Sequence, residues 1–379
     1  MAIDEVGTQP PTTPRVLLFS NKNIYERKVW RCSFNEFAGI LQQIDAVEVV
    51  APKPTSWYRN GKRLVSRLGE YLSTPLNPGV QKVVLDREYD IFAAFIEVPS
   101  ELFHLCAVDD WKRRCKTSVC WVIEFYVKDI PMFKSALEVL SRFDHVVFMA
   151  QAIEPFRKWV GEASGYLAPG VDAIRFCPFP NPPRRSIDVL SIGRRSSETH
   201  HALLQLARDD GSFYVYDTIN SLDGYDLEEH RLLYANMARR SRYFLVNPGK
   251  INKPKETGGQ HEFGYRYFEA AAAGTLMIGE RPQNNKEFDR IFHWDGAVID
   301  LPFGSDRVGN IIREVDMDPE RESRIRKQNI TECLLHHDWA YRWESMLQLA
   351  GLAPLPGLVQ RKERLRQLAK QVQEARVEP

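Results

Sequence analysis

The sequence predicts an α/β protein with two Rossmann-like βαβ domains, and three observations lead to this prediction. Short apolar runs recur along the whole chain, as in RVLLFS at 15–20. Segments with helical periodicity lie between them, as in MFKSALEVLSRF at 132–143. A proline-rich stretch at 165–186 interrupts the alternation once. Strands that are apolar on both faces and alternate with amphipathic helices are typical of parallel sheets covered by helices.

The chain of 379 residues is long enough for two domains of similar size. In the first half, strands are expected at 15–20, 46–52, 90–97, 118–126 and 144–150, with helices at 32–44 and 132–143. In the second half, strands are expected at 186–193, 211–217, 242–249, 275–280 and 297–302, with helices at 226–241 and 286–292. We therefore predict a flexible leader at 1–13, an N-terminal domain at 14–164, a proline-rich hinge at 165–186, a C-terminal domain at 187–350 and a charged helix at 351–379.

Composition restricts the environment and the partners. A net charge of +1 argues against electrostatically driven binding of long nucleic acids. No apolar run approaches the roughly 20 residues that a membrane span requires. The N-terminus has neither secretory nor transit-peptide character, and six scattered cysteines form no CxxC pair. A cytoplasmic protein with reduced thiols is expected.

The segment WYRNGKRLVSRLGEYL at 57–72 predicts a basic amphipathic helix. Such a helix is most often a solvated surface face. The sharper alternative is contact with an acidic or lipid-linked acceptor, so a peripheral membrane contact stays open.

Two loops that follow strands of the C-terminal domain carry positive charge. In an open parallel sheet, ligands bind beyond the carboxyl ends of the strands, where helix N-termini present free N–H groups. Arg194 and Arg195 follow Gly193 there, and an arginine fork suits a diphosphate, although arginines after a strand are usually surface residues. The loop at 247–260 contains paired glycines and three lysines, among them Lys250; a mobile solvated loop is the alternative.

The third candidate is HEFGYRYFEAAAAGTLMIGE at 261–280. A helix beginning near Gly264 would point its N–H groups at an anion, with Glu269 more than a turn further in. A carboxylate facing the ligand at that depth can accept both hydroxyls of a vicinal diol. The alanines at 270–273 let the helix approach the sheet, and Gly274 suits a left-handed C′ position. The alternative is an ordinary amphipathic helix with a solvent-facing acid.

Three segments together resemble the GT-B fold nucleotide-sugar glycosyltransferases, in which two Rossmann-like domains face each other across a cleft. YLAPGVDAIRFCP is similar to their hinge, and Gly193-Arg194 is similar to the start of their nucleotide-binding domain. HEFGYRYFEAAAAGT resembles their "E.FG…..E..A.G.P" signature, with matches at Phe263, Gly264, Glu269, Ala272 and Gly274. The resemblance covers roughly residues 165–345. Within the GT-B enzymes, this segment is similar to the group 1 superfamily of glycosyltransferases, which is of the retaining type.

The resemblance implies roles for individual residues. Glu269 would bind the ribose hydroxyls, and Arg194, with Arg195 as the alternative, would contact the diphosphate. The usual lysine is replaced by Thr199, so Lys250, Lys253 or Arg266 would supply its charge. Seven-residue spacing puts His261 in place of the first glutamate, with Glu262 one step along. In the N-terminal domain, Glu124 is the candidate to face the sugar.

The resemblance implies a glycosyltransferase that moves a sugar from a UDP- or GDP-type donor to an unidentified acceptor, with retention, without a metal and without a further cofactor. The acceptor class stays open among glycans, lipid carriers, natural products, proteins and modified nucleic acids. A nucleotide-sugar epimerase of the same fold and a non-catalytic nucleotide-sugar-binding protein are the alternatives.

Two further strings favour structural roles. DMD at 316–318 lies at a helix boundary, where aspartates are typical capping residues. In HHDWAYRWE at 336–344, adjacent histidines on a helix point about 100° apart and poorly share one metal ion. His336 and His337 are therefore expected, with Trp339 and Trp343, to pack between the domains, and no metal site is predicted.

Overall fold

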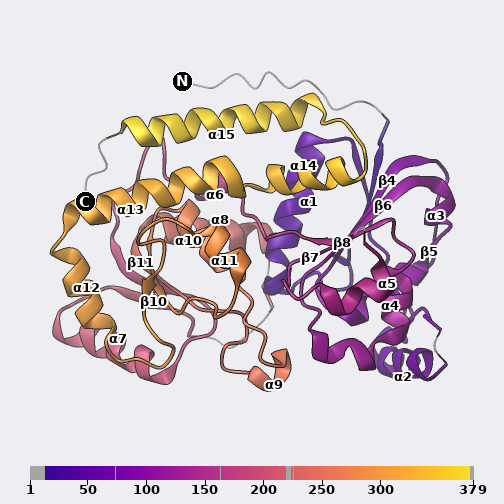
Figure 1. Cartoon of the computed structure of the whole chain (residues 1–379), viewed down its shortest axis with the longest axis horizontal. Coiled ribbons are helices and arrows are strands. Elements are labelled where there is room, and N and C mark those ends of the chain that lie inside the picture. The colour runs from indigo at the N-terminus through magenta and orange to yellow at the C-terminus, as the bar shows by residue number, and fades with distance from the viewer. Residues whose placement is uncertain (1–12, 73, 163, 219–222, 225, 376–379) are drawn as a thin grey trace. The chain divides into compact units, whose positions relative to one another are not determined.

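The computed structural model describes residues 13–72, 74–162, 164–218, 223–224 and 226–375 (Figure 1). Its contacts group the chain into two compact units. The first holds the described residues up to Glu26 together with Phe34–Ala168 and Arg342–Lys362; the second holds Arg27–Ser33, Pro169–Tyr341 and the chain from Glu363 onward. Each unit therefore includes segments from both halves of the sequence, whereas the sequence alone predicted consecutive domains.

A parallel six-stranded sheet organises the first unit, with strand order β2-β1-β4-β6-β7-β8. The strands are β1 (Val16–Phe19), β2 (Val47–Val50), β4 (Tyr89–Ile96), β6 (Cys115–Val122), β7 (His145–Phe148) and β8 (Ser164–Tyr166), and β3 (Val83–Val84) pairs separately with β5 (Val108–Asp109). The helices are α1 (Cys32–Ile44), α2 (Tyr58–Tyr71), α3 (Trp111–Arg114), α4 (Lys134–Leu140) and α5 (Arg157–Val160), with 3-10 turns at Pro99–Ala107, Val127–Met132 and Glu154–Phe156. A further 3-10 turn at Val29–Arg31 belongs to the second unit. The predicted strands and helices of this half are confirmed.

The second unit contains a parallel five-stranded sheet with strand order β10-β9-β11-β12-β13. Its strands are β9 (Ile187–Ser191), β10 (Tyr214–Tyr216), β11 (Ser241–Val246), β12 (Leu276–Gly279) and β13 (Ile299–Asp300). Its helices are α6 (Ala173–Phe176), α7 (Ser197–Asp209), α8 (Leu227–Arg239), α9 (Pro254–Thr257), α10 (Tyr265–Ala272), α11 (Lys286–Ile291), α12 (Val308–Asp316) and α13 (Pro319–Glu332), with a π-helical turn at Cys333–His337. α14 (Trp339–Leu349) and α15 (Pro356–Glu374) follow, and Arg342–Lys362 within this segment belongs to the first unit. Together with the first sheet, this confirms the predicted α/β class with two parallel sheets.

Register explains why these strands are apolar on both faces. Tyr243 of β11 pairs with Val189 and Leu276, and this row packs in one core with α7 and α12. The neighbouring row, which includes Phe244, is equally buried and faces the side on which α8 and α10 lie. Because both faces are covered, the strand sequences show continuous apolar runs rather than alternation. Among the described residues, no helix is both long and apolar enough to cross a membrane, and the cytoplasmic location stays a prediction.

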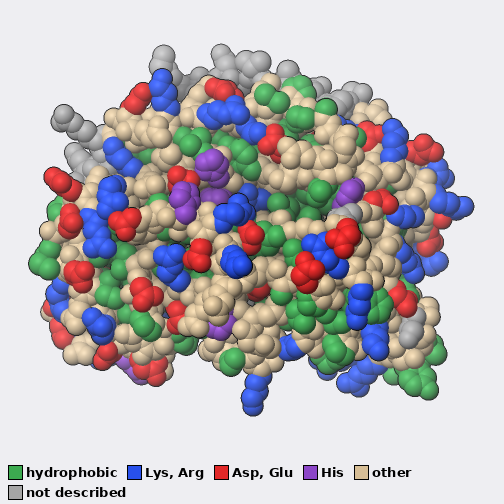
Figure 2. Space-filling model, in the orientation of Figure 1, with side chains coloured by type: hydrophobic (Ala, Val, Ile, Leu, Met, Phe, Trp, Pro, Cys, Tyr) green, Lys and Arg blue, Asp and Glu red, His purple; other side chains and the backbone are tan. Residues whose placement is uncertain are grey.

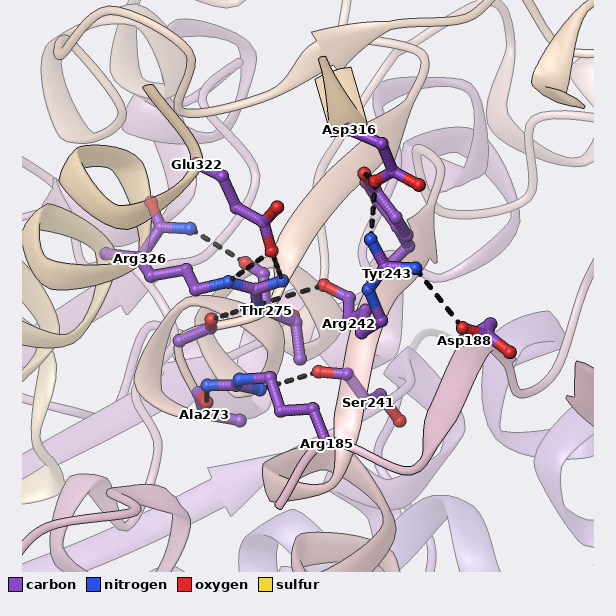
Figure 3. A network of polar contacts seen from close by, with 12 residues as sticks. Arg185, Asp188, Ser241, Arg242, Tyr243, Ala273, Thr275, Asp316, Glu322 and Arg326 are labelled. Atoms are coloured by element: carbon purple, nitrogen blue, oxygen red, sulfur yellow. Dashed lines mark hydrogen bonds and ion pairs between the residues drawn. The ribbon is translucent and has the colours of Figure 1, made fainter. Parts of the chain in front are cut away.

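The amino edge of the C-terminal sheet is fixed by two arginines (Figure 3). Arg185 donates to the carbonyls of Ser241 at 2.6 Å and Ala273 at 2.9 Å. Arg326 donates to the carbonyls of Gly274 at 2.9 Å and Arg242 at 3.1 Å. These donors satisfy carbonyls at the C-terminal end of α10, where helical partners end. Gly274 has the predicted left-handed backbone, with φ of +66°. The position and orientation of α10 are thus set from its C-terminal end.

The two strings expected to be structural lie as follows. Asp318 accepts from the N–H of Arg321 at 3.0 Å and caps α13, which confirms the capping prediction for this residue. Asp316 instead accepts hydrogen bonds from Arg242 and Tyr243. His337 and Trp339 pack within the second unit, whereas Trp343 donates to Asp45 at 2.8 Å within the first.

Candidate functional site

The candidate site lies at the carboxyl edge of the C-terminal sheet. β9 leads into the loop 192–196, β11 leads into the loop 247–260, and α10 begins at Tyr265, with Gly264 as its N-cap. Parallel strands bring their carboxyl ends to one edge, and α7 and α10 each add an N-terminus near it. No Cβ contact would occur at Gly264, so the N-terminus of α10 is open to an approaching group.

Arg266 joins the first turn of α10 to the loop after β9. Its Nε donates to the carbonyl of Ile192 at 2.5 Å. Its Nη2 lies where a Cβ on Gly193 would stand only 2.3 Å away, and the φ of Gly193 is +92°. The N–H of Gly193 donates to Asp217 at 2.5 Å. Close approach and a left-handed backbone both require glycine here, so the structure brings Gly193 and Arg266 together.

The two arginines after Gly193 have different surroundings. Arg194 is exposed. Arg195 donates from Nη2 to the carbonyl of Asp217 at 2.8 Å, and its guanidinium lies 5.0 Å from the ring centroid of Tyr216. Among the described residues, the buried Nη1 of Arg195 has no hydrogen-bond partner. Arg194 is therefore available to an incoming anion, while Arg195 mainly holds the loop against β10.

The loop 247–260, which contains three lysines and is called the lysine loop below, lies near Arg194. Lys253 donates to Glu256 at 2.6 Å. That hydrogen bond is the largest cause that lowers the pKa of Glu256, and the charges of Lys250 and Arg194 lower it further. The loops after β9 and β11 thus bring three cations around one exposed carboxylate. Arginine and lysine side chains are typical binding groups for phosphate oxygens.

Glu269 lies inside the protein, with 4% of its surface exposed. Its Oε1 accepts a short charge-assisted hydrogen bond from Arg231. Its Oε2 accepts from the hydroxyl of Tyr234 at 2.9 Å. The alternative of a solvent-facing acid is therefore wrong, because the carboxylate is held by two partners from α8. Each oxygen retains one lone pair, so the carboxylate can still accept from a ligand.

Sequence reasoning missed the residues that hold this carboxylate. Arg231 is 1% exposed, and its guanidinium lies 4.6 Å from the ring centroid of Phe176, which belongs to the predicted hinge. Tyr234 contacts the same ring edge to face, with centroids 5.9 Å apart. The available signal in the sequence was an arginine followed three positions later by a tyrosine on one predicted helix. Only the tertiary structure shows that both side chains are buried and face α10.

His230 on α8 is also close to these charges. Burial is the largest cause that lowers its pKa below 6.5; Arg231 lowers it further, while Glu269 and Asp217 raise it. The ring stacks on Tyr234 with an interplanar angle of 5°. Burial therefore favours the neutral form of this imidazole.

His230 should make stability depend on pH. Between its lowered folded-state pKa and about 6.5, the unfolded chain binds more protons than the folded chain. Stability therefore rises with pH through this window and is lost as pH falls through it. His230→Gln should flatten that part of the profile, measured as denaturant midpoints between about pH 5 and pH 8. The same substitution at exposed His201 is the control; an unchanged slope in His230→Gln would contradict the assignment.

The two candidates before α10 are placed differently from each other. Glu262 is 6% exposed and accepts from Asn285 at 3.3 Å, and its carbonyl accepts from the N–H of Gly249 at 2.8 Å. Asn285 also donates to the carbonyl of His261 at 2.9 Å. His261 is half-buried, and its buried Nδ1 has no hydrogen-bond partner among the described residues. Glu262 thus joins loops, whereas His261 keeps a free ring nitrogen.

Glu124 belongs to the first unit. It follows β6, is half-buried, and its N–H donates to the carbonyl of Glu97 at 2.8 Å. Glu97 in turn follows β4, so two carboxylates come after neighbouring strands at the carboxyl edge of this sheet. Its role toward a sugar stays a prediction. Among the described residues, no group of three or more His, Cys, Asp or Glu side chains is arranged to hold a metal ion.

Solved structures share this fold over most of the chain. An alpha-glucosyltransferase in complex with UDP-glucose and DNA containing an abasic site has a TM-score of 0.52 and 13% identity, over 89% of this chain and 100% of that chain. An alpha-glucosyltransferase in complex with UDP and a 13-mer DNA containing a HMU base has a TM-score of 0.51 and 11% identity, over 89% and 100% of the two chains. At this identity the likeness establishes the fold: this chain has the GT-B fold of glycosyltransferases.

A comparison with protein-family models matches a shorter part of the chain. Residues 211–348 match the family model described as glycosyl transferase-like. No curated protein matches the chain. The matched range contains α8, the lysine loop and α10, the segments that carry Glu269 and its partners. The resemblance to GT-B glycosyltransferases is thereby confirmed, while the retaining stereochemistry stays a prediction.

Proposed function

We propose that the protein transfers a sugar from a UDP- or GDP-type nucleotide sugar to an acceptor held by its N-terminal unit, with retention and without a metal. One observation carries the proposal most directly. Arg266, in the N-terminal turn of α10, holds the loop of Gly193 and Arg194 against that turn. His261, where the signature begins, lies five positions before Arg266, and Glu269 lies three positions after it. The groups that would donate hydrogen bonds to the diphosphate and the carboxylate that would accept them from the ribose diol therefore come from one helix and its neighbouring loop.

Each group has a role in this proposal. Arg194, Lys250 and Lys253 neutralise the charge that develops on the leaving diphosphate, the main barrier to transfer. Glu269 accepts from the ribose hydroxyls. His261 offers its free nitrogen to the sugar, and Glu124 lies on the acceptor side. The relatives in complex with UDP and UDP-glucose support the donor class, and the family resemblance supports retention.

Binding of the donor half is the first test. Thermal shift and calorimetry with UDP, GDP and their sugars should identify one base that stabilises the chain, by about 2.7 kcal/mol at 100 times its dissociation constant. Incubation with the matching sugar nucleotide, followed by NMR, then separates slow hydrolysis or transfer from epimer formation. An epimer would replace the transferase assignment with the epimerase alternative. No binding to any nucleoside diphosphate would contradict the proposal.

Arg194→Ala should weaken nucleoside-diphosphate binding by about tenfold or more, because a charge-assisted hydrogen bond contributes roughly 1.5–3 kcal/mol. Its thermal midpoint should stay near that of the wild type, since the side chain is exposed. Arg208→Ala is the matched control, since Arg208 is an exposed arginine in the last turn of the same α7 that Arg194 precedes. Equal affinities for both variants and the wild type would remove Arg194 from the site.

A further inference from the structure

Exposed apolar side chains are concentrated in one short segment of the first unit. Of the 13 large hydrophobic residues that are exposed in the described chain, five lie within 16 positions: Trp57 at 46%, Leu64 at 71%, Leu68 at 46%, Tyr71 at 85% and Leu72 at 53%. All five lie on α2 or directly at its ends, and the proposed nucleotide site uses none of them. Scattered exposed leucines need no explanation, but a cluster of this kind marks an interaction surface.

The spacing within α2 separates two stripes. Leu64, Leu68 and Tyr71 follow one another at intervals of four and three residues, so they share a helix face. Arg59, Arg63 and Arg67 recur every four residues and form a second stripe beside the first. All three arginines are exposed. The outer surface of α2 is thus half apolar and half cationic.

The opposite face of α2 is fixed to the protein. The hydroxyl of Tyr58, which is 8% exposed, lies 3.0 Å from Nε2 of the buried His104. Gly69 is buried, and its carbonyl accepts from the hydroxyl of Ser135 at 2.9 Å. Glu70 accepts from the N–H of Ser135 at 3.0 Å. These anchors fix which side of α2 faces the protein, and Leu64, Leu68 and Tyr71 stay exposed on the outer side. An ordinary surface helix would instead expose mainly polar residues.

Two exposed side chains lie at or just before the start of α4, the helix that contacts α2. Met132 is 58% exposed and precedes α4, the helix that contacts α2 through Ser135. Lys134 at the start of α4 is exposed as well. In Figure 2, hydrophobic and basic side chains lie next to one another in the lower right, where Figure 1 places α2.

We propose that the outer face of α2 docks on the surface of a bilayer that contains anionic lipids. The leucines and Tyr71 enter the boundary between headgroups and acyl chains, and the arginine stripe binds the lipid phosphates. Charge complementarity and the apolar stripe together favour this partner. A nucleic acid would match the arginines but leave the leucines in water, and a protein groove would match the leucines without needing three arginines in register. The chain itself would be a peripheral, reversibly bound protein.

Vesicle co-sedimentation tests the proposal without any need for enzymatic activity. The full chain should bind vesicles of phosphatidylcholine with phosphatidylglycerol and bind phosphatidylcholine vesicles at least tenfold more weakly. Leu64→Glu/Leu68→Glu and, separately, Arg63→Glu/Arg67→Glu should each weaken binding to the anionic vesicles at least tenfold. Higher salt should weaken wild-type binding, because it screens the arginines.

The control carries the same change of charge elsewhere. Leu232 and Leu233 are 53% and 60% exposed on α8, and Leu232→Glu/Leu233→Glu should bind anionic vesicles as the wild type does. Circular dichroism and thermal midpoints verify that all variants are folded. Equal binding to both vesicle types, loss of binding in the control, or undiminished binding in either α2 variant would overturn the proposal. Binding of short duplex DNA that needs the arginines but not the leucines would instead assign the face to nucleic acid.

Discussion

Glu269→Gln is expected to weaken nucleoside-diphosphate binding by about ten- to a hundredfold while the protein stays folded. The substitution keeps an oxygen that can accept from Arg231 or Tyr234, but it removes the charge that strengthens a bond from a ribose hydroxyl. Charge-assisted hydrogen bonds contribute roughly 1.5–3 kcal/mol, and 1.4 kcal/mol corresponds to a factor of ten. Calorimetry with the nucleotide that the wild type binds measures the change.

Alanine is the wrong substitution at this position. Arg231 is 1% exposed, and Glu269→Ala would leave its buried guanidinium with neither the charge partner nor the side-chain acceptor, whereas glutamine keeps an acceptor. Breaking a buried pair in this way costs about 3–5 kcal/mol of stability. Lost binding in such a variant would not distinguish a ligand role from unfolding.

A ligand-side comparison separates the two roles of Glu269. If the carboxylate accepts from both ribose hydroxyls, the wild type should prefer the ribonucleotide over its 2′,3′-dideoxy analogue, and Glu269→Gln should lose most of that preference. Tyr234→Phe is the matched control, because it removes one protein donor to Oε2 and leaves the carboxylate in place. Equal preference in wild type and Glu269→Gln would mean that Glu269 only holds α10 to α8.

The strands and the α/β class were predictable from the sequence, because a strand that is buried on both faces of a parallel sheet has a continuous apolar sequence. It missed β8, since SGY at 164–166 has no apolar run and contains a glycine at the start of the proline-rich stretch. The sequence pattern also did not show that Arg27–Ser33 belongs to the second unit and Arg342–Lys362 to the first. Contacts between residues far apart in the chain decide that grouping, and periodicity reports only local structure.

The candidate site was predictable where a motif fixes backbone geometry. Gly193 lies where Arg266 approaches the backbone closely, and Gly264 lies where the start of a helix has open space around it. The partners of Glu269 were not predictable, because Arg231 and Tyr234 lie more than 30 residues away and look like an ordinary helical surface in sequence. A buried carboxylate requires a cation, but the sequence does not say which of the 51 lysines and arginines supplies it.

The second large effect concerns the opposite end of α10. Arg326 is 1% exposed and Glu322 is 4% exposed, and the two form an ion pair one helical turn apart on α13 (Figure 3). Arg326→Ala should destabilise the protein by about 3–5 kcal/mol, because Glu322 is left as an uncompensated buried charge. Chemical denaturation followed by tryptophan fluorescence measures the shift, since Trp294 donates to Asn329 on the same helix at 2.8 Å.

A double variant separates the two functions of Arg326. Replacing both partners, as in Arg326→Met/Glu322→Leu, removes the buried charges together, and such replacements are often neutral where the pair acts only on itself. Here Arg326 also donates to the carbonyls of Gly274 and Arg242, so the double variant should recover part of the loss and remain about 1–3 kcal/mol less stable than the wild type. Full recovery would show that these carbonyl bonds contribute nothing. At temperatures where the double variant is folded, its nucleotide affinity should equal that of the wild type, because Arg326 supports the end of α10 that points away from Gly264.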